Sequence, residues 1–177
     1  MRLEQAPQNA TVTLPVTAIV AVFESCFLES HGTRCCGGAR EPLYVPRSPA
    51  AHAQLSFRGD FAASALHEIS HWCLAGERRR LLPDFGYHYV AAPRSAAAQV
   101  QFLQFEVLPQ ALESTFADAA GVSFSYSFDD VDDRFVQLRP GFQLAVDSAK
   151  QQLPRGYLQT LAGARARRFL QALAASR

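Results

Sequence analysis

The stretch "ALHEISHWCLAG", residues 65–76, contains the pattern H-E-x-x-H and predicts a helix that holds a metal ion. Residues four apart lie one above the other on a helix face, so His67 and His71 can each direct a ring nitrogen at one ion about 2 Å away. Glu68 is rotated by about 100° from His67 and can approach a metal-bound water without being a ligand. In metalloproteases with this motif the glutamate is the general base.

Two core histidines, satisfied by backbone carbonyls and one carboxylate, are the alternative interpretation of this pattern. Apolar residues such as Leu66, Ile69 and Trp72 surround most of the helix, which is typical of a buried helix. Each imidazole in such surroundings must find a polar partner, and packing alone does not supply one. We therefore favour a metal site.

Two residues mark the expected ends of this helix, which spans residues 61–75. Asp60 stands directly before it and is a good N-cap, because its carboxylate can accept hydrogen bonds from unpaired backbone N–H groups. Gly76 stands at the other end, where a left-handed residue commonly stops a helix.

The rest of the chain predicts an α+β fold, a mostly helical single domain with a small sheet. We expect helices over residues 16–30, 95–121, 131–151 and 154–174, and short strands over 41–46, 53–57 and 84–90. Gly32 and the pair Gly37–Gly38 interrupt the helical pattern near the N-terminus. Pro109 is expected to kink or divide the third helix. A single catalytic domain over residues 1–177 follows from the absence of repeats and long linkers.

Composition limits the classes of function. Apolar residues make up 49% of the 177 residues, enough for a core, and no apolar run reaches the roughly 18 residues that a membrane span needs. The polar start shows no secretory signal, so we expect a cytoplasmic protein with four free thiols. A net charge of +1 argues against nonspecific nucleic-acid binding. Nothing in the sequence indicates the oligomeric state.

A third metal ligand has to come from another element. The acidic candidates downstream are Glu77, Asp84, Glu106, Glu113, Asp118 and the run "DDVDD" at residues 129–133. Glu106 is the best placed, because it lies within the apolar helical stretch "QFLQFEVL", where an unpaired carboxylate would be costly. Glu113 and the "DDVDD" run have the character of ordinary solvated acids.

Two histidines and one carboxylate leave the chemistry open. This ligand set serves zinc in thermolysin-like peptidases and ferrous iron in facial-triad oxygenases. A zinc metallopeptidase, an iron oxygenase and a noncatalytic domain stabilised by a metal are therefore all compatible with these residues alone.

The long string "SALHEISHWCLAG" resembles the bacterial elongation factor P hydroxylase family. The segments "DFGYHY", "QVQFLQFEVLPQAL" and "RARRFLQAL" carry the resemblance through most of the chain, together with "FESCF" and "TRCCGGAREPLYVP" near the N-terminus. The chain departs from the family pattern at Leu103, where an acid is expected, and at "RGDF", where "HGF" is expected. The loss of the acid at Leu103 supports Glu106 as the ligand, and the other departures concern substrate-facing details.

The resemblance implies hydroxylation of a lysine of elongation factor P that already carries a β-lysyl group. It implies a nonhaem metal, taken to be Fe(2+), with O2 as co-substrate and a fold similar to metallopeptidases. On the matching positions His67, His71 and Glu106 are the expected metal ligands, and Glu68 has an inferred role in proton transfer. Zinc is the alternative metal.

The segment after the metal helix offers candidates for substrate binding. In "DFGYHYV", a strand would place Tyr87 and Tyr89 on one side, facing the substrate pocket, and His88 on the other. Tyrosines of an ordinary half-buried strand explain the pattern equally well, and His88 is a possible fourth ligand.

A run of arginines follows the metal helix. Arg78, Arg79 and Arg80, with Arg94 nearby in sequence, could attract an acidic surface of the protein substrate. The alternative is a solvated helix end, since positive charge is favourable near a helix C-terminus.

Overall fold

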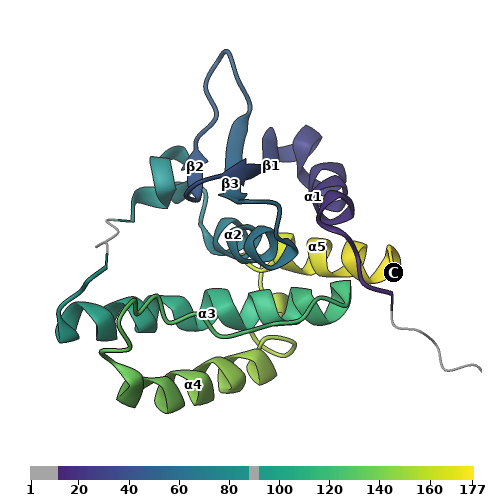
Figure 1. Cartoon of the computed structure of the whole chain (residues 1–177). Helices are drawn as coiled ribbons and strands as arrows, with labels where there is room; N and C mark the ends of the chain where they lie inside the picture. Colours follow the sequence, from purple (N-terminus) through teal and green to yellow (C-terminus); the bar gives the residue numbers. More distant parts are fainter. Residues whose placement is uncertain (1–11, 88–91) are drawn as a thin grey trace, which may run out of the picture.

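Three strands form a small sheet at one side of the molecule (Figure 1). The computed structural model describes residues 12–87 and 92–177. β3 (Ala53–Arg58) lies in the middle, pairs in parallel with β1 (Thr33–Ala39) and antiparallel with β2 (Leu43–Val45). The strands predicted over 41–46 and 53–57 are confirmed.

The sequence does not predict β1, because the pair Gly37–Gly38 indicates a break in regular structure. The strand continues through both glycines, with a shift in its pairing register between Cys36 and Ala39. Glycine inside a strand commonly marks such an irregularity or a close approach. Gly37 shows the close approach, since a Cβ there would lie 2.5 Å from Asp60 Oδ1.

The metal-motif helix α2 (Ala62–Leu74) lies beneath the sheet, between the sheet and α3 (Figure 1). α1 (Val16–His31) and α5 (Ala164–Ala175) pack beside it. Trp72 is fully buried against Phe27 and Phe23, with ring centroids 4.7 and 5.1 Å away. The burial expected for this helix is confirmed, and Cys73 is a fully buried free thiol.

Both predicted caps of α2 are wrong. Phe61 occupies the N-cap position without a side-chain hydrogen bond, while the Asp60 carboxylate is directed toward Gly37. At the other end Ala75 is the extended C-cap residue, and Gly76 does not adopt a left-handed conformation. The last carbonyls of the helix are therefore satisfied from elsewhere.

α3 (Ala96–Ala120) crosses the face of α2 opposite the sheet, and α4 (Arg139–Gln152) packs on the far side of α3 (Figure 1). The Ser95 side chain caps the start of α3, and Gly121 ends α3 in the left-handed conformation with φ 69°. Pro109 is buried within this helix and does not divide it.

Residues 122–130 form no strand but run along α3. The Gln110 side chain donates to the carbonyl of Ser127 over 2.8 Å and accepts from its amide over 3.1 Å. Gln99 donates to the carbonyl of Phe128. Side chains of α3 thus replace a strand partner for this segment.

The two closing helices are shorter than expected. The predicted helix 131–151 begins as turns and a short 3-10 helix, η3 (Val136–Leu138), before α4. The predicted helix 154–174 contains η4 (Tyr157–Gln159) before α5. The α+β class with a mostly helical single domain is confirmed. Among the described residues, no helix combines the length and apolar character that crossing a bilayer requires.

Candidate metal centre

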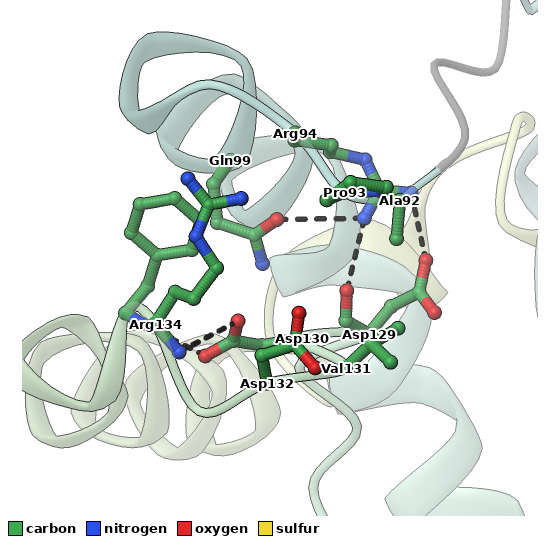
Figure 2. A pocket seen from close by; sticks show the side chains of 10 residues that line it. Ala92, Pro93, Arg94, Gln99, Asp129, Asp130, Val131, Asp132 and Arg134 are labelled. Atoms are coloured by element: carbon green, nitrogen blue, oxygen red, sulfur yellow. Dashed lines mark hydrogen bonds and ion pairs between the residues drawn. The ribbon is translucent and has the colours of Figure 1, made fainter.

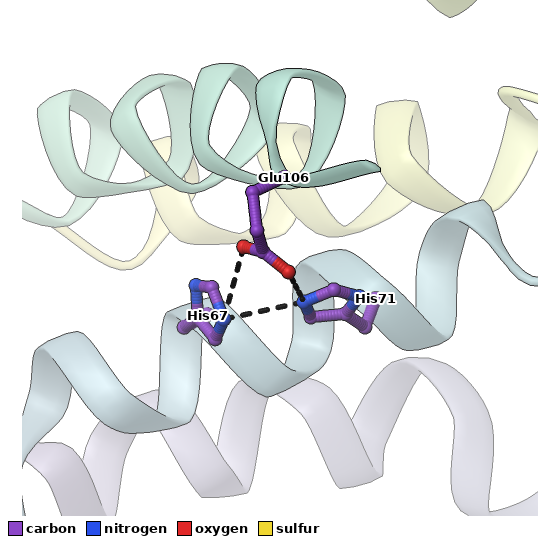
Figure 3. Close-up of side chains that lie close together, drawn as sticks. All are labelled: His67, His71 and Glu106. Carbon is purple, nitrogen blue, oxygen red and sulfur yellow. Dashed lines mark hydrogen bonds and ion pairs between the residues drawn. The ribbon is translucent and has the colours of Figure 1, made fainter. Parts of the chain in front are cut away.

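Three predicted ligands converge between α2 and α3 (Figure 3). The Nε2 atoms of His67 and His71 lie 3.2 Å apart. One carboxylate oxygen of Glu106 lies 3.6 Å from the His67 nitrogen, and the other lies 3.3 Å from the His71 nitrogen. Helical spacing aligns the two histidines, and α3 brings Glu106 over them from a segment 35 residues further along the chain.

The spacing of these atoms fits a metal ion. With bonds of about 2.1 Å, atoms that lie 3.2 and 3.6 Å apart would subtend angles of about 100° and about 120° at the ion. Such angles suit a tetrahedral site or one face of a larger coordination sphere. The donor set therefore accommodates zinc and ferrous iron alike.

Glu113 was predicted to be solvated, and this prediction is wrong. It is 6% exposed, and its Oε2 accepts a hydrogen bond from Nδ1 of His67 over 2.8 Å. An ionised carboxylate only accepts, so this contact places a proton on Nδ1, and Nε2 is the nitrogen that faces Glu106 and His71. A carboxylate behind a ligating histidine is the arrangement that orients metal-bound imidazoles.

Spacing along α3 could have revealed Glu113. Glu106 and Glu113 are seven residues apart, which is close to two helical turns, so both lie on the same helix face. That face packs against α2, so both carboxylates are directed at the metal-motif helix. The prediction for Glu113 considered only its neighbours in sequence and did not take into account that Glu113 shares a helix face with Glu106.

The charges of the site stabilise one another. Burial of Glu106 opposes its ionised form, but the charge of His71 and its hydrogen bond, with His67 and Gln110, lower the pKa of Glu106 to about 2. Burial of the His67 ring opposes its charged form, but the hydrogen bond to Glu113 and the charges of the nearby glutamates raise the pKa of His67 from 6.5 to about 10. The surrounding carboxylates thus favour the protonated form of His67, and the histidines favour the ionised form of Glu106.

Glu68 lies beside the ligands without joining them. It is half-buried on α2, and the described residues provide no hydrogen-bond partner for its carboxylate. Burial raises its pKa, the two histidines oppose this shift, and Glu106 and Asp84 add to it. An unpaired carboxyl group at this place can accept or return a proton.

The segment after α2 is not a strand where the structure describes it. Residues Pro83–Gly86 form a tight 3-10 turn, η2, with left-handed φ values of 45° at Asp84 and 58° at Phe85. The Asp84 carboxylate accepts from the amide of Tyr44 over 2.8 Å, and Phe85 stacks on the Tyr44 ring. The segment therefore covers the edge of β2 through side chains instead of extending the sheet.

Of the two tyrosines predicted to bind substrate, the structure describes only Tyr87. Tyr87 is 43% exposed, with its ring centroid 6.2 Å from that of Phe105, the neighbour of Glu106 in sequence. Tyr89 and His88 lie outside the described residues. Substrate binding by Tyr87 and Tyr89 stays a prediction.

Arg94 is not at the metal centre. It is 3% exposed and lines a small pocket at the start of α3 (Figure 2), where its guanidinium binds the Asp129 carboxylate over 2.7 Å. It also contacts Gln99, which precedes Glu106 by about two helical turns, or roughly 10 Å. The structure gives Arg94 a partner within the fold, and its role in substrate binding stays a prediction.

The three consecutive arginines have different environments. Arg80 donates to the carbonyl of Ala75 over 2.9 Å, and Arg79 donates to the carbonyl of Phe85 over 3.1 Å and covers the Tyr87 ring. Arg78 is exposed, and within the described ranges its guanidinium has no hydrogen-bond or ion-pair partner. A docking role fits Arg78 better than the other two.

Comparison with known proteins identifies the family. The family model described as elongation factor P hydroxylase matches residues 22–176. An elongation factor P lysine hydroxylase of Haemophilus influenzae is 39% identical over 139 residues, which cover 78% of this chain and 78% of that protein. The chain belongs to the elongation factor P hydroxylase family.

Proposed function

We propose that this protein is an Fe(2+)-dependent oxygenase that hydroxylates the β-lysylated lysine of translation elongation factor P in the cytoplasm. The observation that carries the proposal is the convergence of His67, His71 and Glu106 in a member of this family. The similar protein of Haemophilus influenzae is named elongation factor P lysine hydroxylase. The proposed catalytic unit is a single domain over residues 1–177.

The donor set suits the proposed chemistry. A ferrous ion held by His67, His71 and Glu106 would supply the activation of O2 that attack on an unactivated C–H bond requires. One oxygen atom enters the C–H bond of the lysyl arm and the other leaves as water, so an external reductant must supply two electrons. Three protein ligands leave open positions, which is what an oxygenase needs.

The protein's own residues set the conditions at this site. Glu113 holds the proton on Nδ1 of His67, so that Nε2 is free to bind the metal. Gln110, fully buried, lies 3.5 Å from Glu106 Oε2 and limits the rotation of that carboxylate. Glu68 is the proposed catalytic group, which accepts or returns a proton beside the ligands.

The substrate arm is proposed to approach along the exposed rings near Glu106. Tyr87 and Phe105 are 43% and 59% exposed, and they lie next to the turn of α3 that carries the ligand. Aromatic faces attract ammonium groups, and a lysyl arm carries them. Tyr89 is proposed to take part on the same side of the pocket.

Intact-mass analysis of β-lysylated elongation factor P tests the proposal. The factor is incubated with O2, a reductant and the protein loaded anaerobically with ferrous iron. Addition of the mass of one oxygen atom is expected, and it should be absent with the His71→Ala variant. A zinc-loaded enzyme that cleaves the factor, with no gain of oxygen, would instead establish the metallopeptidase alternative.

A further inference from the structure

The last turn of α2 carries His71 and ends without a left-handed glycine cap. Only one backbone bond closes it, from the Ala75 amide to the His71 carbonyl over 2.9 Å. A helix end leaves its final carbonyls without intrahelical donors, and such groups need partners when they are buried. Here Arg80 donates to the carbonyl of Ala75 over 2.9 Å, and the other partners come from the C-terminal part of the chain.

Arg165 of α5 supplies the main contacts. Its Nη2 donates to the carbonyl of Cys73 over 3.0 Å and also to the carbonyl of Ala75. The hydroxyl of Tyr157 lies 3.0 Å from the same Cys73 carbonyl. The guanidinium also covers Trp72, with its central carbon 4.7 Å from the ring centroid. One side chain thus holds three of the four residues that follow His71.

No carboxylate competes for this arginine. Among the described residues no acidic group lies within ion-pair distance of Arg165. The ion pairs between arginine or lysine and aspartate are formed by other residues, at Asp118 of α3 and in the "DDVDD" run. A cation at a helix C-terminus is favourable, because the final carbonyls carry partial negative charge. The position of Arg165 is therefore explained by the end of α2 and not by a salt bridge.

The two histidine ligands differ in how they are held. Glu113 fixes the ring of His67 directly. In contrast, no described residue provides a hydrogen bond to Nδ1 of His71, whose Nε2 faces the other ligands. The direction of the His71 ring therefore depends on the backbone of the last turn, which Arg165 holds.

We propose that Arg165 is a positioning residue for the metal ligand His71. The "RARRFLQAL" segment at residues 165–173, distant from the proposed metal ligands in sequence, then has a function at the site. This inference rests on the metal site of the proposed function. It adds a second support, so that Glu113 orients one imidazole and Arg165 orients the other through the helix backbone.

Metal binding by Arg165→Gln tests this proposal. The probe is Co2+ added to the full-length metal-free protein without oxygen, because its visible absorption reports ligand geometry. Affinity is expected to fall about tenfold, as for other partners behind a ligand, with a changed absorption spectrum. Arg165→Lys should recover only part of the affinity, because an ammonium lacks the planar guanidinium that covers the Trp72 ring while its Nη2 reaches both carbonyls.

Arg167→Gln is the matched control on the same helix. Arg167 donates to the carbonyl of Leu158 in η4 and makes no described contact with α2. We expect this variant to lose stability while keeping the Co2+ affinity and spectrum of the unaltered protein. Tyr157→Phe removes the hydroxyl contact to the Cys73 carbonyl, and it replaces Arg165→Gln as the test variant if Arg165→Gln does not fold. We expect a smaller loss of Co2+ affinity for Tyr157→Phe than for Arg165→Gln.

The outcomes separate the inference from the proposed site. If Arg165→Gln and Tyr157→Phe melt at lower temperature but bind Co2+ as the unaltered protein does, Arg165 stabilises the fold only and the inference is overturned. If the unaltered protein itself does not bind Co2+, or His71→Ala binds it equally well, the proposed metal site fails. NMR of the ring nitrogens adds a direct readout, since Arg165→Gln should shift His71 and leave His67 unchanged.

Discussion

At the scale of single residues, the hydrogen bond between Glu113 and Nδ1 of His67 determines that Nε2 is the nitrogen available to a metal. Glu113→Gln keeps the size of the side chain but replaces a charged acceptor by a neutral amide. We expect about tenfold weaker metal affinity, because a carboxylate raises the basicity of the ligating imidazole and fixes its orientation. Isothermal titration of the metal-free protein with ferrous iron measures this.

Asp118→Asn is the control for that variant. Asp118 also lies on α3, but it forms an exposed pair with Lys150, and its side chain is 67% exposed. Its loss should leave metal affinity unchanged, because exposed ion pairs contribute little. Equal affinities for Glu113→Gln and Asp118→Asn would show that His67 does not need the carboxylate.

Glu106 and Glu68 should differ in what they do for the metal. Glu106→Ala removes one of three ligands, and metal content after anaerobic purification should fall sharply. Glu68→Gln should keep about one iron per chain but slow turnover, as expected for a proton-handling group beside the ligands. Metal analysis together with the rate of hydroxylation distinguishes them, and an empty site in Glu68→Gln with a full site in Glu106→Ala would reverse the assignment.

The stability of the metal-free protein should depend on pH through His67. Its pKa is raised from 6.5 to about 10, so its stabilising effect is complete below pH 6.5 and is lost as the pH rises through about 10. Urea unfolding should show a larger stability advantage over His67→Gln at pH 6 than at pH 10. A constant difference between the two proteins would mean that His67 is not charged in the metal-free cluster.

At the scale of elements, α3 both presents Glu106 and binds the irregular segment 122–130. Gln110 is fully buried and makes two hydrogen bonds to the backbone of Ser127. Gln110→Leu should lower the free energy of unfolding by roughly 1 to 3 kcal/mol, because two partly buried hydrogen bonds to the backbone of Ser127 are lost. Urea unfolding measures the loss, and limited proteolysis should then cut within residues 122–130.

Ser123 provides a control on that segment. Its side chain is exposed and makes no hydrogen bond that the structure describes, so Ser123→Ala should leave both the stability and the cleavage pattern unchanged. Unchanged proteolysis in Gln110→Leu would indicate that packing of Phe124, Tyr126 and Phe128, and not the glutamine, holds the segment on α3.

Local patterns predicted the elements whose causes are local. The metal helix, its burial and the two histidines follow from helical periodicity and i, i+4 spacing, and Glu106 follows from the cost of an unpaired charge in an apolar stretch. β1 was missed because the reason for its glycines lies in a different segment, at Asp60. The predicted C-cap of α2 was wrong because its last carbonyls are bound by the side chains of Arg80 and of Arg165, and a partner about 90 residues away cannot be found by a local rule.

At the scale of the whole molecule, the candidate metal centre lies where three layers meet. The sheet packs on one face of α2, and α3 packs on the other with α4 behind it (Figure 1). Glu106 and Glu113 of α3 contact the two histidines of α2, while Arg165 of α5 contacts the C-terminal end of α2. The site therefore forms only when the C-terminal half of the chain has packed on the N-terminal half.

The surface that meets a protein substrate is proposed to include Arg78. Changing all three arginines together would also remove the carbonyl contacts of Arg79 and Arg80, so the single variant Arg78→Ser is the cleaner test. We expect the KM for elongation factor P to rise roughly two- to fivefold at low salt, since one exposed charge contributes modestly. Metal content and kcat should not change, because Arg78 touches neither the ligands nor their supports.

Salt dependence decides whether the effect of Arg78 is electrostatic. Exposed charges are screened over a Debye length of about 8 Å at physiological ionic strength, so the difference in KM between Arg78→Ser and the unaltered protein should disappear as salt is added. Arg155→Ser, which removes another exposed arginine between α4 and α5, is the control and should leave KM unchanged at every salt concentration. If Arg78→Ser behaves like this control at low salt, Arg78 is a solvated residue after the helix end. Selection of the substrate would then depend on the rings of Tyr87 and Phe105 beside the metal centre.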